Sequence, residues 1–440
     1  MKTKFSLSLM LLTVLIYSCR KTGTEPTAFQ VEQTKTFSSE VAQKWQDLQL
    51  RILRLPTGPN PFGLNGNRYF AYCGIALYEA VVPGMPAYQS LYGQLTDMPA
   101  MPLTEPGKAY HWPACANAAL AFLNKNFYTN TSEPNKAAID SLENALTAEY
   151  KTQTDAETFE RSANFGKAVA EKIFNWSKTD GSLDTYPDFP ISTTIGAWTP
   201  TAPNPTAVSA PYWGNNRLFV QGSLIETSSP PPPPYSTDPN SPYYAMVKEV
   251  YDISQTLTPQ QKATALYFND NPGFQAGTHY ISIFSQVMHN ENPQLDFYAI
   301  AHAKTGMALA ESQIGCWKKK YELIVDRPIR YIRNVMGHAT WSPVLPTPPH
   351  PEFPSGHSQT GGALAAVLTS LYGPNYKFTL HTYDNLGMTP RPYNSFMEMV
   401  EDIGNSRVYG GIHFSYTCTE SSKQGAKIAE NIISTLRFKK

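Results

Sequence analysis

The sequence predicts an all-α fold, and two observations support that class. Apolar residues recur at helical spacing through most of the chain, whereas the strict alternation of a half-buried strand is scarce. The chain has 440 residues, of which 41% are hydrophobic and only 16% charged. A chain of this length and composition buries a large core, in one big helical-bundle domain or in two coupled parts.

The first half of the chain contains five predicted helices. In segment 38–55, apolar residues keep helical spacing until a Pro-Thr-Gly-Pro turn begins at Pro56. Segment 67–82 is densely apolar, so we expect it to be buried. The other three helices are expected at 112–124, 135–150 and 156–177.

Segment 186–243 has a different character, because prolines recur in it and five of them stand together at 230–234. Such a composition allows a disordered linker. The aromatic residues Trp198, Tyr212 and Trp213 favour instead an irregular segment that packs on the helices. We therefore predict an N-terminal helical part, 36–243, that ends in this segment, and a C-terminal helical part, 244–440.

Helical patterns resume in the second half, at 244–254, 258–269, 278–290 and 293–320. The last of these carries Trp317 one turn before Lys320, so Trp317 either lines a pocket with it or packs in the core. A final helix is expected to begin at Ser421, which forms a capping-box pattern with Gln424.

The N-terminus has the features of an export signal. Residues 1–18 combine a basic start with an apolar stretch too short to span a membrane, which predicts a signal peptide. The residues before Cys19 resemble a bacterial lipobox; the alternative is a plain secretory signal with a coincidental cysteine. Polar residues 19–35 are expected to form a tether. We expect an exported lipoprotein of the cell envelope, in the periplasm or on the outer membrane, attached only through lipid at Cys19.

Charge and the other cysteines narrow the function classes. Lys and Arg total 35, as do Asp and Glu, so no basic surplus indicates a nucleic-acid partner. Cys73, Cys115, Cys316 and Cys418 lack the clustered spacing of a zinc site. They allow three disulfide connectivities or free thiols, and we expect mostly buried thiols.

Two segments in the second half concentrate groups that suit an anion. Lys320 and Arg327 stand seven residues apart, or two helical turns, which predicts that they share a helix face. Residues 354–357, Pro-Ser-Gly-His, lead into a run of small and apolar residues that predicts a helix. We expect the N–H groups of Ser355 and Gly356 at an exposed helix N-terminus, where unpaired donors favour an anion.

A third segment, 406–413, adds an arginine and a histidine. Together the segments supply three fixed cations, two neutral donors and two histidines, and the motifs place no carboxylate among them. This inventory suits a tetrahedral oxyanion better than a divalent cation. The set is Lys320, Arg327, Arg407, Ser355, Gly356, His357 and His413.

The order Lys-x6-Arg-Pro, Pro-Ser-Gly-His and Ser-Arg-x5-His resembles the signature shared by vanadium-dependent haloperoxidases and the type 2 phosphatidic acid phosphatase superfamily. The resemblance extends from about Gln43 to the C-terminus and includes the Gly-Ala-Trp-Thr-Pro stretch at Gly196. It therefore separates this chain from the small membrane-embedded phosphatases, which resemble only its final third. It implies a helical bundle of the vanadium chloroperoxidase and acid phosphatase type.

The same resemblance implies vanadate as the cofactor, with hydrogen peroxide and a halide as substrates. It makes His413 the residue bonded to vanadium and His357 the acid–base group, which fits a side chain that exchanges protons near neutral pH. The groups that would contact the vanadate oxygens are Lys320, Arg327, Ser355, Gly356 and Arg407.

His350 precedes His357 by seven residues. This position resembles that of an extra histidine in bromide- and iodide-oxidising members of the family, where chloride-oxidising members carry phenylalanine. It implies that His350 sets halide preference or assists proton handling, and that the product is a hypohalous species from iodide or bromide. A surface histidine in a proline-rich turn is the alternative.

Thr417 departs from the family motif, which often has Asp four residues after the histidine. A phosphatase with His413 as nucleophile needs that acid to orient and balance the ring, whereas a neutral metal ligand needs it less. We therefore favour a haloperoxidase over a vanadate-inhibited acid phosphatase. A third hypothesis, an oxyanion-binding lipoprotein, would keep the cations and tolerate loss of His357.

Overall fold

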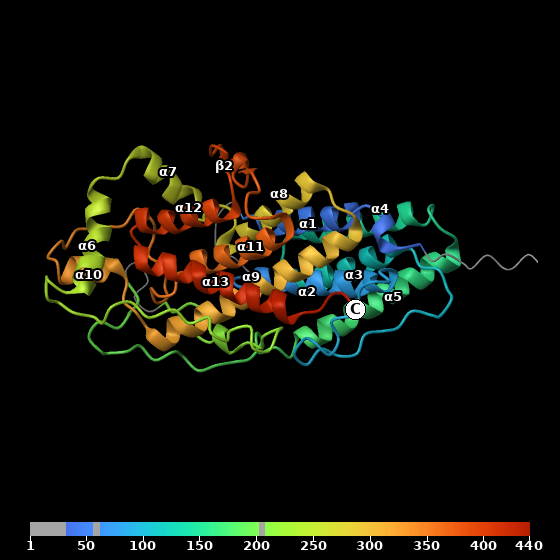
Figure 1. The fold of residues 1–440 in the computed structure, drawn as a ribbon, viewed down its shortest axis with the longest axis horizontal. Helices are drawn as coiled ribbons and strands as arrows, with labels where there is room; N and C mark the ends of the chain where they lie inside the picture. The colour runs from blue at the N-terminus through green and yellow to red at the C-terminus, as the bar shows by residue number, and fades with distance from the viewer. Residues whose placement is uncertain (1–31, 56–61, 202–206) are drawn as a thin grey trace, which may run out of the picture.

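The computed structural model describes residues 32–55, 62–201 and 207–440. The predicted signal peptide, Cys19 and most of the predicted tether lie outside the described residues. Within them the chain forms thirteen α-helices and one two-stranded antiparallel sheet, which confirms the all-α class (Figure 1). No helix in the described ranges is long and apolar enough to cross a membrane.

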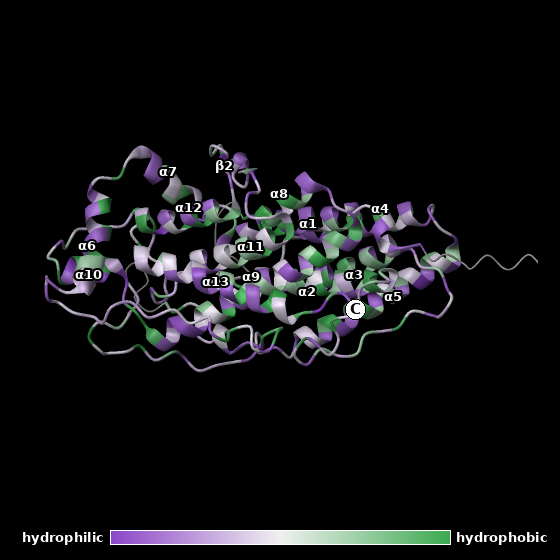
Figure 2. Cartoon of the chain, viewed as in Figure 1, coloured by the Kyte–Doolittle hydropathy of each residue, from purple (hydrophilic) through white to green (hydrophobic). Residues whose placement is uncertain are grey.

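The N-terminal half is a group of five helices that pack on one another, and each was predicted to within a few residues. Figure 2 shows apolar residues gathered where these helices meet and hydrophilic residues toward their outer surfaces. α2 is almost wholly buried, as its composition predicted. The helices are α1 (Glu40–Leu53), α2 (Asn65–Val81), α3 (Trp112–Phe127), α4 (Glu133–Tyr150) and α5 (Ala156–Ser177).

The C-terminal half contains eight helices and the small sheet. Two of the helices, α10 and α12, were not predicted. The elements are α6 (Pro242–Gln255), α7 (Pro259–Tyr267), α8 (His279–Glu291), α9 (Leu295–Leu323), α10 (Pro328–Asn334), α11 (Gly356–Tyr372), β1 (Phe378–Leu380), β2 (Arg391–Tyr393), α12 (Phe396–Tyr409) and α13 (Ser415–Thr435).

α9 connects the two halves. Its 29 residues rise about 43 Å at 1.5 Å per residue, and it packs against α2 at one end and against α11 and α13 at the other (Figure 1). Most of its length is buried, because it has neighbours on several sides. It ends where Ile324 adopts a left-handed conformation with φ 42°, which turns the chain toward Arg327.

α11 and α13 cross closely because each has a glycine at the contact. A Cβ on Gly362 would lie 2.1 Å from the carbonyl oxygen of Ser422, and one on Gly425 would lie 1.7 Å from that of Gln359. Neither position has room for a side chain. The close crossing brings the first turn of α11 next to the residues that follow His413.

α13 begins at Ser415 and not at Ser421, so the capping-box prediction was wrong. Ser421 lies inside the helix and is fully buried. Its hydroxyl donates to the carbonyl of Thr417 at 2.6 Å and accepts from the backbone N–H of Ser355 at 2.8 Å. The serine is needed for a contact between helices and not for a helix end.

The proline-rich segment packs on the helices, as its aromatic residues predicted. Trp198 and Phe219 are buried, and the backbone N–H of Trp198 donates to the carbonyl of Ile324 at 2.7 Å. Ala197 forms an isolated bridge with Val325, so the segment braces the chain just before Arg327. The disordered-linker alternative is therefore wrong for 186–201 and 207–241. The four predicted thiols are free and buried.

Candidate active site

A cavity of about 450 Å³ lies between the first turn of α11, the end of α9 and the loops around Asn269 and Pro348. Five of the predicted site residues line it. They are His350, Gly356, His357, Arg407 and His413. The other three are Lys320, Arg327 and Ser355, and of these Arg327 contacts two of the lining residues, His350 and His413. The structure thus brings together the three sequence segments and the loop that carries His350.

His413 is held by a carboxylate that the motifs did not place. Its Nδ1 lies 2.8 Å from Oε1 of Glu352, which is fully buried. The backbone N–H of Phe414 donates to the same oxygen at 3.2 Å, and Thr417 Oγ1 donates to the other at 2.9 Å. Burial raises the pKa of Glu352 to about 7. His413 therefore has a carboxylate partner, and the premise of the argument from Thr417 was wrong.

Arg327 determines which nitrogen of His413 carries the hydrogen. Its Nη1 lies 3.1 Å from His413 Nε2 and 2.7 Å from the carbonyl oxygen of Ile412. A guanidinium only donates, so Nε2 accepts and is unprotonated. The hydrogen of the neutral ring is then on Nδ1, where Glu352 accepts it. Burial and the charges of Arg327 and Lys320 hold the pKa of His413 well below its usual value.

Lys320 and Arg327 do not share a helix face, contrary to the prediction from their spacing. α9 ends between them, and Arg327 is the residue that precedes α10. They converge because the chain turns at Ile324. The seven-residue spacing therefore pointed to two residues that do come together, but they do so at a turn and not on a shared helix face.

The charge of Lys320 is not fixed, and its hydrogen-bond donors are already in use. Its Nζ donates to the carbonyls of Pro351 at 2.7 Å, Glu352 at 3.1 Å and Pro354. Burial lowers the pKa of Lys320 to about 7. Lys320 therefore ties the loop before α11 to the end of α9.

The turn before α11 is buried, contrary to the predicted exposed N-terminus. Ser355 has no exposed surface, and its backbone N–H is taken by Ser421. Its side chain caps α11 by accepting from the N–H of Ser358 at 3.3 Å. Gly356, the first residue of the helix, lines the cavity, and no carbonyl of its own helix can reach its N–H.

Arg407 has a donor with no partner. One of its Nη atoms donates to the carbonyl of Phe268, whereas its buried Nε has no hydrogen-bond partner in the described part of the chain. Burial lowers the pKa of Arg407. An unpaired buried guanidinium donor is costly, so this group suits an anion in the cavity.

His357 belongs to a second histidine–carboxylate pair, which sequence reasoning missed. Its Nε2 lies 2.8 Å from Oδ2 of Asp270, and Oδ1 of Asp270 lies 2.7 Å from His279 Nδ1 and accepts from Tyr383 at 3.1 Å. Burial acts to raise the pKa of Asp270, but the two histidines hold it below its usual range. The ionised carboxylate of Asp270 accepts a hydrogen bond from Nε2–H of His357. Nδ1 of His357 then carries no hydrogen and can accept a proton.

Asp270 and its two histidines contact one another directly, at 2.7 and 2.8 Å. One ligand atom from each of Asp270, His279 and His357 lies within 4.8 Å of the others. Burial, followed by Arg407, lowers the pKa of His357 to about 4, although Asp270 opposes this shift. The ring is therefore neutral near pH 7.

His350 faces the cavity beside Trp317, with ring centroids 5.4 Å apart. Its Nδ1 accepts from Arg327 Nη2 at 3.0 Å, which places the hydrogen of the neutral ring on Nε2. The same Nδ1 lies 3.3 Å from the carbonyl of Pro351, but it has no hydrogen left to donate there. His350 is partly buried, and its contact with Arg327 argues against the surface-histidine alternative. Trp317, which sequence left between pocket and core, lines the cavity.

No motif spacing pointed to Glu352 or Asp270. Glu352 is a lone acid in a proline-rich loop, and Asp270 follows α7 some 87 residues before His357. The structure does mark Asp270, which has a positive φ of 66° in a short polar stretch. That signal exists only in the backbone of the folded protein.

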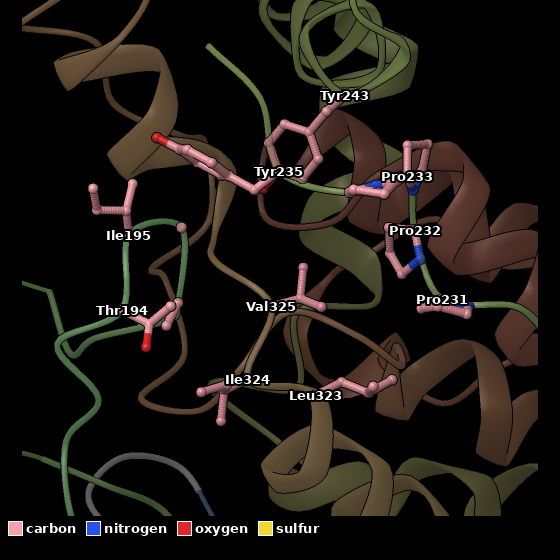
Figure 3. Close-up of a pocket in the computed structure, with 13 residues that line it drawn as sticks. Thr194, Ile195, Pro231, Pro232, Pro233, Tyr235, Tyr243, Leu323, Ile324 and Val325 are labelled. Atoms are coloured by element: carbon pink, nitrogen blue, oxygen red, sulfur yellow. The ribbon is translucent and has the colours of Figure 1, made fainter.

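A second cavity of about 360 Å³ lies along the proline run and can be followed in Figure 3. It is lined by Pro231–Pro234, Tyr235, Tyr243 and residues 323–325, among others. The tyrosine hydroxyls are its only titratable groups, and none of the predicted site residues lines it. The predicted site residues therefore line the first cavity and not this one.

Comparisons with known proteins give one answer. A sequence model of the VCPO second helical-bundle domain matches residues 301–438, the part that carries the three motifs. The crystal structure of a bacterial vanadium-dependent iodoperoxidase is similar over 92% of this chain and 97% of that chain, with 28% identity and a TM-score of 0.81. In its fold and in this segment of its sequence, the chain is similar to vanadium haloperoxidases. The resemblance predicted from the motifs is confirmed.

More distant vanadium haloperoxidases share the fold. Holo and apo crystal structures of a bacterial vanadium-dependent chloroperoxidase each cover 91% of this chain and 98% of their own, with 18% identity and TM-scores of 0.66 and 0.65. At that identity the likeness shows the fold alone. A comparison with curated proteins found no match.

Proposed function

We propose that this protein is a vanadium-dependent haloperoxidase that oxidises iodide or bromide with hydrogen peroxide. The observation that carries the proposal is the state of His413. Its Nε2 is unprotonated, buried, and directed at Arg327 within a group of cationic donors. A neutral imidazole whose lone pair is not occupied by a proton is the form that binds a metal.

Vanadate fits the residues present. Arg407 Nε is a buried donor without a partner in the described residues, and the Gly356 N–H faces the same cavity. Arg327 and Lys320 would add donors if a vanadate oxygen replaced one of the carbonyls that accept from them now. His413 Nε2 would hold the metal, and Arg327, Arg407, Lys320, Ser355 and Gly356 would hold its oxygens. Bound vanadate would supply the Lewis-acid centre for peroxide.

The residues of the chain then have separate tasks. His357 Nδ1 accepts a proton from hydrogen peroxide and returns it, since Asp270 keeps Nε2 protonated. The cationic group stabilises negative charge on oxygen. The overall reaction consumes halide, hydrogen peroxide and one proton, and it yields hypohalous acid and water. The halide loses two electrons, and the peroxide gains them.

The preference for iodide or bromide rests on His350. Its Nε2–H is directed away from Arg327, so it can donate to an anion or to peroxide in the cavity. The 28% identical neighbour is described as an iodoperoxidase. Replacing His350 by Phe should shift the ratio of iodide to chloride oxidation. Replacing exposed His381 by Ala should leave that ratio unchanged.

An acid phosphatase is the second candidate, and Glu352 favours it. A histidine nucleophile needs a carboxylate on its far nitrogen, and His413 has one at 2.8 Å. Two assays separate the candidates. Vanadate-loaded protein is tested for peroxide-dependent oxidation of iodide, bromide and chloride, and metal-free protein for hydrolysis of p-nitrophenyl phosphate. Hydrolysis without halide oxidation would reverse the assignment, and failure of both would leave an oxyanion-binding protein.

Export through a signal peptide and lipid attachment at Cys19 are also part of the proposal. The lipobox-like residues before Cys19 support it. Labelling cells with a radioactive fatty acid should mark the wild-type protein and not a Cys19→Ser variant. Equal labelling of both would exclude Cys19 as the anchor.

A further inference from the structure

We propose that Glu352 is the residue that positions His413, in place of the acid that the family motif often puts at position 417. The inference rests on the proposed function, because it concerns how the vanadate ligand is aimed. It assigns a role to a loop residue outside the three motifs.

The hydrogen bonds of Glu352 explain why it is held so firmly. Its carboxylate is fully buried and accepts from three donors, which are His413 Nδ1 at 2.8 Å, the Phe414 N–H at 3.2 Å and Thr417 Oγ1 at 2.9 Å. All three donors belong to one stretch of five residues. The carboxylate therefore fixes the ring of His413 relative to the backbone that carries it.

This arrangement also fixes the tautomer. Glu352 accepts at Nδ1 while Arg327 donates toward Nε2. Both contacts favour the same neutral form, with its lone pair on Nε2. Without Glu352, Nδ1–H would be a buried donor with no acceptor, and the opposite tautomer would become accessible. That tautomer would present N–H and not a lone pair to the metal.

Positions 352 and 417 act as alternatives for one carboxylate. Thr417 Oγ1 lies 2.9 Å from Glu352 Oε2, so an aspartate at 417 would place a second carboxylate against the first. A threonine donates a hydrogen bond there instead. The departure from the motif is thus explained by the contact it makes.

Glu352 also has a second, purely structural link to the site, which an experiment must separate. Its backbone carbonyl accepts from Lys320, as do those of Pro351 and Pro354. A substitution that moved this loop would disturb the cationic group itself. A ligand that needs the cations but forms no bond to His413 would lose affinity only if the substitution had moved this loop.

The test compares vanadate with inorganic phosphate on the same variants. Dissociation constants for both are measured on metal-free wild type, Glu352→Ala and Glu352→Gln. Removing a group that orients a metal ligand typically costs 10- to 100-fold in metal affinity, so Glu352→Ala should weaken vanadate by about that factor. Phosphate should weaken by less than about threefold. Glu352→Gln should recover most of the vanadate affinity, because its Oε1 still accepts from Nδ1.

Controls follow from other parts of the chain. Glu79 is a buried acid far from the cavity, and its Oε1 accepts from the N–H of Leu91 at 2.7 Å. Glu79→Gln should leave both affinities unchanged. The thermal midpoint of each variant reports whether it folds. The double variant Glu352→Ala with Thr417→Asp should regain vanadate affinity, and no gain would refute the exchange of positions.

Three results would overturn the inference. Equal losses of vanadate and phosphate affinity would show that Glu352 only shapes the loop, and unchanged vanadate affinity in Glu352→Ala would show no role. The third would be an unchanged His413 tautomer in Glu352→Ala, and this readout does not depend on the proposed function. Nitrogen NMR of histidine-labelled, metal-free protein should show His413 as the Nδ1–H tautomer in wild type, and a change in Glu352→Ala. If wild type binds no vanadate but shows this tautomer, the function fails and the positioning role stands.

Discussion

On one side of the cavity His413 gives its Nδ1–H to Glu352, and on the other side His357 gives its Nε2–H to Asp270. We call these the His413 side and the His357 side. Each is a neutral histidine beside a buried carboxylate, but the ring nitrogen that carries no hydrogen differs: it is Nε2 in His413 and Nδ1 in His357. On the His413 side the unprotonated nitrogen accepts from Arg327, whereas the ring of His357 lines the cavity.

The carboxylates differ as well. Burial raises the pKa of Glu352 to about 7, although Arg327, Lys320 and the hydrogen bonds from Phe414 and Thr417 act to lower it. Asp270 stands between two histidines, which hold its pKa below the usual range. This difference supports the proposed division of tasks, in which the His413 pair aims a lone pair and the His357 pair accepts and returns a proton.

Removing the ring on the His413 side should have the largest effect. In His413→Ala no group remains to bond the metal, so vanadate binding and halide oxidation should both fall by about 1,000-fold or more. Phosphate should still bind to the cationic group. Equilibrium dialysis with each anion checks this, and partial recovery with added imidazole is the positive control. Undiminished halide oxidation would mean that the assignment of the two sides is mistaken.

Removing the ring on the His357 side should affect turnover and not binding. A general acid–base group typically contributes 10²- to 10⁴-fold, so His357→Ala should lower kcat by that order while vanadate affinity changes less than about tenfold. Steady-state kinetics at saturating vanadate measures the first quantity. If affinity fell as steeply as kcat, His357 would be a binding residue.

Neutralising the acid on the His357 side should have a smaller effect with a diagnostic pH dependence. Burial and Arg407 lower the pKa of His357 to about 4 even though Asp270 acts to raise it. The base works only when unprotonated, so kcat/KM should fall as pH drops through about 4 in wild type. In Asp270→Asn it should fall by about tenfold at pH 6, as expected for a mispositioned ring. Its acid limb should move to lower pH, and a shift to higher pH would contradict the pairing.

The smallest effect is expected at His279. Its Nδ1 lies 2.7 Å from Oδ1 of Asp270, as an ion-pair contact. His279→Gln keeps a donor for Asp270, so kcat should change by about threefold or less, as for one neutral hydrogen bond. His279→Phe leaves Asp270 one donor short and should lower kcat further. Equal rates for both variants would show that Asp270 does not need this contact.

The helices were largely predictable, and the two exceptions have different causes. α10 has only seven residues, so its periodicity is too short to detect. α12 did carry a signal, because Ser395 accepts from the N–H of Glu398 in the pattern of a helix start. The same pattern at Ser421 is a false signal. Pattern alone cannot separate them, since only Ser421 is preceded by residues that already form a helix.

The sequence by itself determined the helical class, the cationic residues and both histidines of the site, because these depend on local periodicity and on residue types that a motif records. Only the tertiary structure decided how they work. Glu352 and Asp270 reach their histidines across 61 and 87 residues, through contacts that no local pattern encodes. Which ring nitrogen is free, and how far burial shifts each pKa, follow from the neighbours that folding supplies.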